Sequence, residues 1–185
     1  GKHPIKYPPI RAAISHLYFE SIHPFEDGNG RIGRAIADKA LSQSTGYPLL
    51  LSLSATIESN KKAYYNALEN SQRKNEITPW LIYFLQVIID AQLKAESLID
   101  FTLKKARFFD LYRSKMNERQ LKSINRMFKE GTKGFEGGMT AKKYMSITQT
   151  SKATATRDLK VLEELGVLIV RGSGRSTHYH INLDN

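Results

Sequence analysis

Hydrophobic residues in the first part of the chain recur at the three- and four-residue spacing of amphipathic helices. The run from Pro9 to Ile22 follows this spacing and predicts one helix, in which we expect His16 to be structural. A second helix is predicted to follow Gly30, because apolar residues again have mostly helical spacing there: Ile32, Ala35, Ile36 and Ala40. The glycines between these two runs predict a tight loop.

Two further helices are marked by the residues at their N-termini. Thr78 and Pro79 have the order of an N-cap and a first helical residue, and the Leu-, Ile-, Val- and Phe-rich sequence after them predicts a helix to about residue 112. Asn117 and Gln120 have the spacing of a capping box. Apolar residues at helical spacing follow, so this helix is predicted to run to about Glu130.

The C-terminal sequence predicts two short helices followed by a β-hairpin. The helices are expected at 140–147 and 151–165, and the β-rich runs at 167–170 and 176–181 are joined by a glycine-containing turn. Three helices and a hairpin in this order are typical of a winged helix-turn-helix domain. The expected fold class is therefore mainly α, with a helical core over residues 1–112 and a small α+β winged helix-turn-helix domain over residues 113–185.

Composition limits the class of protein. The 185 residues, 41% of them hydrophobic, suffice for one or two small domains that each bury a core. No stretch approaches the roughly 20 apolar residues of a membrane-spanning helix, so we expect no membrane partner. The absence of cysteine excludes disulfides and thiolate metal sites within this sequence and agrees with a cytoplasmic location.

Charge is distributed unevenly along the chain. Residues 1–105 carry 13 Lys and Arg against 10 Asp and Glu, whereas residues 106–185 carry 15 against 8. The basic part coincides with the predicted winged helix, whose cations could reach the bases or phosphates of DNA. A surface for protein contacts or self-association is the open alternative. The candidate DNA-binding residues are Lys152, Thr154, Thr156, Arg157 and Lys160 on the second short helix, with Arg171 and Arg175 on the hairpin.

The densest chemistry lies in residues 23–34, which read His-Pro-Phe-Glu-Asp-Gly-Asn-Gly-Arg-Ile-Gly-Arg. Gly28 and Gly30 can adopt backbone angles that are closed to other residues, and so bring amide N–H groups close to an anion. The helix N-terminus that follows favours phosphate. Arg31 and Arg34 share a helix face and can fork onto phosphate oxygens. This pattern predicts a nucleotide triphosphate site.

Other side chains of this segment add metal-binding and acid–base chemistry. Asn29 offers an amide that can donate to phosphate, and Asp27 offers a hard oxygen for Mg²⁺, with Glu26 as the competing carboxylate. His23 is placed to remove a proton from a hydroxyl nucleophile, although a role in capping a helix or filling a core is the alternative. Phosphate on one side and a base on the other predict group transfer.

These twelve residues resemble the signature of the Fic family of nucleotidyltransferases and match it at every signature position. The resemblance implies a Fic-type helical core that transfers AMP from Mg-ATP to a Ser, Thr or Tyr hydroxyl of a target protein and releases pyrophosphate. Gly30 stands where the Doc-type kinases have Lys, which favours transfer of AMP over transfer of phosphate. Another donor, such as UTP or a CDP-alcohol, stays open because the signature contacts phosphates rather than the base.

The resemblance also implies individual roles. His23 is the expected general base, Asp27 the magnesium ligand and Phe25 a buried anchor. The segment 64–68 resembles one in which the second tyrosine, here Tyr65, contacts adenine, and a core position for this tyrosine stays open. The residues expected to hold the phosphates are Gly28, Asn29, Gly30, Arg31 and Arg34.

Two features bear on regulation and completeness. Fic enzymes are often silenced by a helix whose glutamate pairs with the second signature arginine, here Arg34. Glu136 is in a formal match to that motif, but the glycines around it oppose a helix, so we expect a loop there. The signature begins only 22 residues from the N-terminus, upstream of which the family places further helices and a target-docking flap, and the first residue is Gly1. We therefore expect an N-terminally truncated Fic core.

Two functions of different classes follow. The chain belongs either to an AMP transferase whose winged helix recruits targets or DNA, or to a transcriptional regulator that uses the Fic fold as a nucleotide sensor. An intact His23 favours the enzyme, because a sensor has no use for a general base. The expected partners are ATP and an unidentified target protein, while double-stranded DNA and a second copy of the chain stay open.

Overall fold

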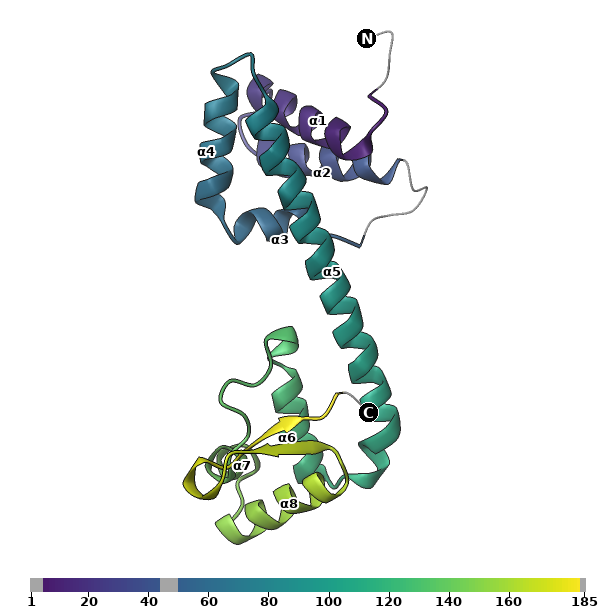
Figure 1. Ribbon diagram of the computed structural model, residues 1–185, viewed down its shortest axis with the longest axis vertical. Helices are drawn as coiled ribbons and strands as arrows, with labels where there is room; N and C mark the ends of the chain where they lie inside the picture. Colours follow the sequence, from purple (N-terminus) through teal and green to yellow (C-terminus); the bar gives the residue numbers. More distant parts are fainter. Residues whose placement is uncertain (1–4, 44–49, 184–185) are drawn as a thin grey trace. The chain divides into compact units, whose positions relative to one another are not determined.

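The structure, a computed structural model, describes residues 5–43 and 50–183, with the side chain of Arg175 left out. The chain divides into two compact units, residues 1–96 and 97–185, each with its own hydrophobic core. The division falls within helix α5 (Thr78–Tyr112), at residue 96, whereas the sequence led us to expect a boundary at residue 112 (Figure 1). No helix of the described ranges is long and apolar enough to cross a membrane.

The described part of unit 1 is helical, as the apolar spacing predicted. Besides the first part of α5 it contains α1 (Pro8–Ile22), α2 (Asn29–Ser42), α3 (Leu53–Glu58) and α4 (Lys61–Gln72). The helices predicted around Pro9–Ile22 and after the glycine loop are thus present, and α5 ends at the predicted residue. It is the carbonyl of Ile77, not of Thr78, that accepts the first helical hydrogen bond of α5, from Leu81 N–H at 3.0 Å.

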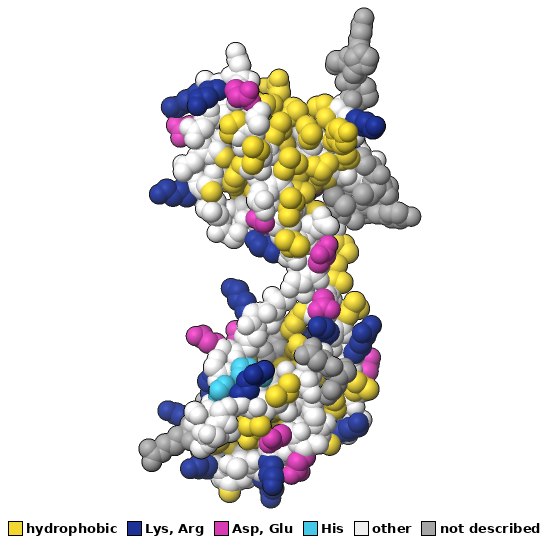
Figure 2. All heavy atoms as spheres, in the orientation of Figure 1, with side chains coloured by type: hydrophobic (Ala, Val, Ile, Leu, Met, Phe, Trp, Pro, Cys, Tyr) yellow, Lys and Arg dark blue, Asp and Glu magenta, His cyan; other side chains and the backbone are white. Residues whose placement is uncertain are grey.

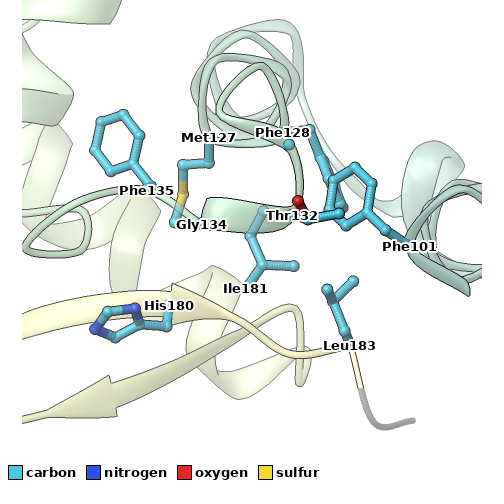
Figure 3. A pocket seen from close by; sticks show the side chains of 10 residues that line it. Phe101, Met127, Phe128, Thr132, Gly134, Phe135, His180, Ile181 and Leu183 are labelled. Carbon is cyan, nitrogen blue, oxygen red and sulfur yellow. The ribbon is translucent and has the colours of Figure 1, made fainter. Parts of the chain in front are cut away.

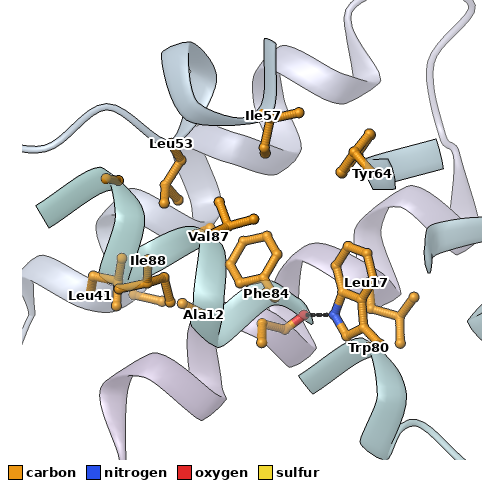
Figure 4. Close-up of a cluster of buried hydrophobic side chains, with 14 of the residues drawn as sticks. Ala12, Leu17, Leu41, Leu53, Ile57, Tyr64, Trp80, Phe84, Val87 and Ile88 are labelled. Carbon is orange, nitrogen blue, oxygen red and sulfur yellow. Dashed lines mark hydrogen bonds between the residues drawn. The ribbon is translucent and has the colours of Figure 1, made fainter. Parts of the chain in front are cut away.

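The core of unit 1 is built around two aromatic residues of α5, Trp80 and Phe84, which are fully buried (Figure 4). The indole N–H of Trp80 donates to the carbonyl of Ala13 at 2.8 Å and so joins α5 to α1. Ala12 and Ala37 are also fully buried, and small side chains allow helices to approach closely. The close packing of α1 against α2 fixes both ends of the loop that carries the signature residues.

The buried face of α2 differs from the one that the sequence predicted. The structure buries Gly33, Ala37, Ala40 and Leu41 in this helix, while Ile32 and Ala35 are exposed and Ile36 is only half-buried. Of the four apolar residues proposed, only Ala40 is buried. Close approach to α1 selects the small residues for the interface, and the larger Ile32 is left outside.

Among its described residues, unit 2 contains three further α-helices and a two-stranded antiparallel sheet. These elements are α6 (Glu118–Phe128), α7 (Ala141–Thr148), α8 (Lys152–Glu164), β1 (Leu168–Arg171) and β2 (His178–Ile181), with short 3₁₀ turns at Arg113–Lys115, Gly131–Lys133 and Gly174–Ser176. The strands pair with Leu168 opposite Ile181. The helices and the hairpin lie where the sequence predicted them, to within about two residues.

Local side-chain chemistry explains these boundaries. Both hydrogen bonds of the predicted capping box are present: Gln120 N–H donates to Asn117 Oδ1 at 3.0 Å, and Asn117 N–H donates to Gln120 Oε1 at 2.9 Å. The hydroxyls of Thr140 and Ser151 accept from the first turns of α7 and α8, as expected of N-caps. Residues 132–137 form no α-helix, so Glu136 lies in the loop that the glycines predicted.

Both units expose large hydrophobic side chains, in unit 2 for example Leu103 and Leu111. Unit 1 exposes several large hydrophobic side chains, among them Tyr18, Ile22, Ile82 and Leu93. Figure 2 shows hydrophobic side chains gathered on one face of this unit, while Lys and Arg are spread over unit 2. Unit 2 also has a small, half-open pocket of about 150 Å³ with a largely aromatic and aliphatic lining, including Phe101, Phe128, Phe135, His180, Ile181 and Leu183 (Figure 3). This pocket contains none of the predicted signature residues.

Candidate active site

The candidate site begins at His23, the residue that ends α1. Its backbone is left-handed, with φ 49° and ψ 57°, and its N–H donates to the carbonyl of Phe19 at 3.0 Å. This conformation is uncommon for a residue other than glycine and, where a fold maintains it, often marks a functional position. The side chain is exposed. His23 therefore does terminate a helix, but through its backbone, and its imidazole stays available.

The N-terminus of α2 has the features of an anion site. Gly28 precedes the helix with φ 88°, which a side chain would strain, and no side chain among the described residues caps α2. The first turn also carries no acidic residue. The amide N–H groups of the first turn and the positive end of the helix dipole therefore favour an anion such as phosphate.

Asn29, which is only 3% exposed, has a role besides the one predicted for its side chain. Its Nδ2 donates to the carbonyl of Phe25 at 2.5 Å, and its Oδ1 accepts from the N–H of Phe25 at 3.1 Å. Because Oδ1 and one N–H of Nδ2 are used inside the protein, the side chain of Asn29 shapes the loop, and a phosphate contact through the second N–H stays a prediction. Phe25 is in turn not a buried anchor: the residue is 49% exposed, its backbone is held by Asn29, and its ring packs against that of Phe19 with 6.2 Å between centroids.

Asp27 is an exposed carboxylate, with its side chain 92% accessible. Its Oδ1 accepts from Gly28 N–H at 2.6 Å, and its Oδ2 pairs with Arg31 Nη2 at 3.0 Å. Within residues 5–43 and 50–183 no group of three or more His, Asp or Glu side chains could hold a metal alone. A single carboxylate completed by substrate phosphates and water still fits Mg²⁺, and Glu26 is a second exposed carboxylate beside it.

Arg34 is held in place by a hydrogen bond to α3. Its Nε donates to the hydroxyl of Ser54 on α3 at 2.8 Å, which leaves the two Nη groups as the forked donors that a phosphate accepts. Gly30 is an ordinary helical residue rather than one with positive φ, contrary to expectation. Its missing side chain matters in another way, since a Cβ at this position would lie 3.2 Å from Arg34 Nη1.

The tyrosine pair on α4 separates into a core residue and a surface residue. Tyr64 is buried and its hydroxyl lies 2.9 Å from His16 Nε2, whereas Tyr65 is 60% exposed, which excludes the core position for it. The ring of Tyr65 packs edge-to-face on Tyr64, with 5.1 Å between centroids. Lys61, an exposed cation at the start of α4, forms an ion pair with Glu58 at 2.8 Å, which raises its pKa, and the charges of Tyr65 and Arg34 contribute less to that pKa.

Buried titratable groups lie beneath the loop. His16, predicted to be structural, is fully buried and stacks on Trp80 with 5.8 Å between centroids, and burial lowers its pKa to about 4. Burial also raises the pKa of Glu20 and of Asp38, while the charge of Arg34 opposes this shift for both carboxyl groups. His16 is therefore largely uncharged at neutral pH. The pKa values of the Glu20 and Asp38 carboxyl groups both respond to the charge of Arg34.

Three neighbours of the signature were not predicted: Glu20, Ser54 and Lys61. They lie on α1, α3 and α4, so only the packing of these helices brings them to Arg34 or His23. Glu20 alone left a signal in the sequence, because it is the single carboxylate of residues 9–22 and falls one turn before His23.

The candidate DNA-binding residues are partly free and partly engaged. Lys152, Thr156, Arg157 and Lys160 are exposed on α8 around an open hollow. The hydroxyl of Thr154 is hydrogen-bonded to that of Ser151 at 3.1 Å, which ties it to the helix cap, and Lys160 lies 3.7 Å from Glu164. The remaining two lie on the hairpin: Arg171 is exposed at the end of β1, and the side chain of Arg175 is outside the described part of the chain.

Comparison with known proteins bears on the N-terminal part of the chain. Residues 3–41 match the family model described as Fic/DOC family. Over 79 residues, which are 43% of this chain, the sequence is 33% identical to Protein adenylyltransferase Fic of Aedes aegypti, of whose length the match covers 14%. The crystal structure of a Fic family protein from Desulfovibrio desulfuricans G20 is 21% identical, with a TM-score of 0.49 over 97% of this chain and 51% of that one. The chain thus spans only a part of each of these two relatives.

Proposed function

We propose that this chain is part of a protein adenylyltransferase of the Fic type, which transfers AMP from Mg-ATP to a hydroxyl group of a target protein. The observation that carries the proposal is the position of an exposed His23 beside the uncapped N-terminus of α2, with Arg34 held ready by Ser54. The match of residues 3–41 to the Fic/DOC family supports it, as does the similarity to an adenylyltransferase.

In this proposal each part of the site has one task. The amides at the start of α2 and the guanidinium groups of Arg31 and Arg34 bind the phosphates, and Tyr65 offers a flat surface to the adenine. The oxygen of the target hydroxyl attacks the α-phosphorus, the bond to the β-phosphate oxygen breaks, and pyrophosphate leaves. His23 takes the proton of the attacking hydroxyl.

Asp27 is the residue proposed to hold Mg²⁺, whose contribution is to neutralise charge on the phosphates. For this, the carboxylate would have to share or release its ion pair with Arg31. Arg31 would then be free to turn to the phosphates.

The experiment that tests the proposal compares the full-length protein and its His23→Ala variant. Each is incubated with Mg²⁺, cell lysate and ATP labelled on either the α- or the γ-phosphate. We expect label on protein only from the α-phosphate and only with His23, and unchanged ATP binding in the variant. Label from γ alone would indicate a kinase, and equal labelling by both proteins would exclude His23 as the base.

We also propose a second function, binding of double-stranded DNA by unit 2 as part of a transcriptional regulator. The observation that favours it is the cluster of exposed Lys152, Arg157 and Lys160 around the hollow on α8, in the more basic part of the chain. A helix that follows a short turn after another helix is a common element for the major groove. Under this proposal unit 1 would act as a nucleotide sensor, and the labelling experiment would give no label.

A further inference from the structure

Glu20 is a buried carboxyl group that the proposed reaction does not use. It lies on α1 one turn before His23 and is 6% exposed. Its Oε1 is buried and has no hydrogen-bond partner among the described residues. A buried polar atom without a partner costs free energy, so its retention calls for an explanation.

The space for this carboxyl group is provided by Gly33 on α2. A Cβ at position 33 would overlap Glu20 Oε1 and would lie 3.0 Å from His16 Nδ1. The absence of a side chain at Gly33 therefore lets Glu20 lie directly against the backbone of the helix whose N-terminus is the candidate phosphate site. Gly33 occupies a position of the segment 23–34 to which no nucleotide contact was assigned.

The charged and titratable groups around Glu20 come from three helices. They are His16 and His23 on α1, Arg34 on α2 and Tyr64 on α4. Burial raises the pKa of Glu20, and the positive charges of His23 and Arg34 act against this. His23 and Arg34 are both proposed to contact the reactants, and they are also the residues whose positive charge favours the ionised form of Glu20.

We propose that Glu20 is a positioning residue of the signature site, whose buried carboxyl group takes up a proton from solvent when a nucleotide phosphate binds Arg34. The inference rests on the proposed function, because it needs a phosphate at that guanidinium. A bound phosphate offsets the charge of Arg34. The ionised form of Glu20 is then stabilised less, and the population of the neutral form rises. By linkage, proton uptake and nucleotide binding favour each other.

The test is calorimetric titration of the full-length protein with Mg-ATP, at about pH 6, in several buffers of different ionisation enthalpy. The dependence of the observed heat on the buffer gives the protons taken up per nucleotide. Glu20→Gln keeps the shape of the side chain without the titration, and Glu69→Gln is the matched control, because Glu69 is exposed and pairs with Arg73. We expect the wild-type protein and Glu69→Gln to take up the same number of protons per nucleotide. Glu20→Gln should take up fewer, because it lacks the contribution of Glu20.

A second variant keeps the proposal testable if Glu20→Gln does not fold. Gly33→Ala retains the carboxyl group but displaces it, and we expect a changed proton uptake in this variant too. Uptake in Glu20→Gln or in Gly33→Ala that equals wild type would overturn the inference while leaving the proposed function in place. Absence of Mg-ATP binding to the wild-type protein would instead overturn the proposed function and the inference together.

Discussion

Asn29 holds the backbone of Phe25 by a pair of reciprocal hydrogen bonds, Nδ2 to the carbonyl at 2.5 Å and N–H to Oδ1 at 3.1 Å. The side chain thereby bonds back to a residue four positions earlier in the chain and closes the loop between α1 and α2. The loop backbone that carries Glu26 and Asp27 is held by this contact, and the ring of Phe25, which packs against Phe19, is not a buried anchor. The consequence is that a side chain predicted to bind phosphate contributes to the site through the geometry of the loop.

We expect Asn29→Ala to loosen the loop, because it removes two hydrogen bonds worth about 1 kcal/mol each. AMP transfer should fall by about tenfold or more, since a tenfold change corresponds to only about 1.4 kcal/mol in the barrier. Radiolabel transfer and circular dichroism would separate loss of activity from loss of fold. Asn125→Ala, at an exposed position of α6, is the control. Full activity of Asn29→Ala would contradict this role.

Gly30→Ala tests whether the absence of a side chain at position 30 serves Arg34. The added Cβ would crowd Nη1 of Arg34, so we expect ATP affinity to fall by about tenfold, or about 1.4 kcal/mol. Alanine is the better helix former by about 1 kcal/mol, so the melting temperature should not decrease. Ala35→Gly, at an exposed position of the same helix, should show the reverse: lower stability with unchanged affinity. Unchanged affinity in Gly30→Ala would contradict the crowding argument.

The stability of unit 1 should depend on pH through His16. Its pKa is lowered in the fold from 6.5 to about 4, so the unfolded chain binds the proton more readily. Its contribution is therefore complete above pH 6.5 and is lost as the pH falls to about 4, by about 3 kcal/mol in all.

The single tryptophan makes this measurable for one unit, because Trp80 lies in the core of unit 1 against His16. Urea unfolding followed by Trp80 fluorescence would give the free energy of unfolding at each pH. We expect His16→Gln to show a flatter pH dependence than wild type between pH 6.5 and about 4. Glu20 and Asp38 are present in both proteins, so the difference between the two curves reports the contribution of His16 together with its effect on the neighbouring Glu20. Identical curves would show that His16 is not the group responsible.

If unit 2 binds DNA, Arg157 should contribute through phosphate neutralisation. Arg157→Ala should weaken binding to any duplex and reduce the slope of log affinity against log salt by about 0.9. Lys122→Ala, at an exposed position of α6, is the matched control and should leave the slope unchanged. Fluorescence anisotropy at several salt concentrations would measure both. An unchanged slope in Arg157→Ala would remove α8 from the proposed interface.

Local rules predicted most of the elements of this protein. Asn117 with Gln120, Thr140 and Ser151 mark helix starts by hydrogen bonds within one turn, so neighbouring residues suffice to place them. The exposure of Phe25 and the buried face of α2 depend on how closely α1 and α2 pack, which spacing alone does not determine.

The same distinction applies to the candidate site. Residues 23–34 form one contiguous segment, so the sequence was enough to place His23, Asp27 and both arginines near one helix N-terminus. Ser54 and Lys61 come from α3 and α4 and carry no motif of their own. Gly33 could be recognised as a spacer for Glu20 only from the packing of α1 against α2.

The left-handed backbone of His23 implies a trade-off between folding and chemistry. If ending α1 were the single role of position 23, this position would favour glycine. Glycine adopts the left-handed conformation without the cost of about 1 kcal/mol that a side chain brings. The most stable sequence for this turn is therefore not one with an imidazole. If the histidine is the base, the protein gives up stability at the one residue where its reaction begins.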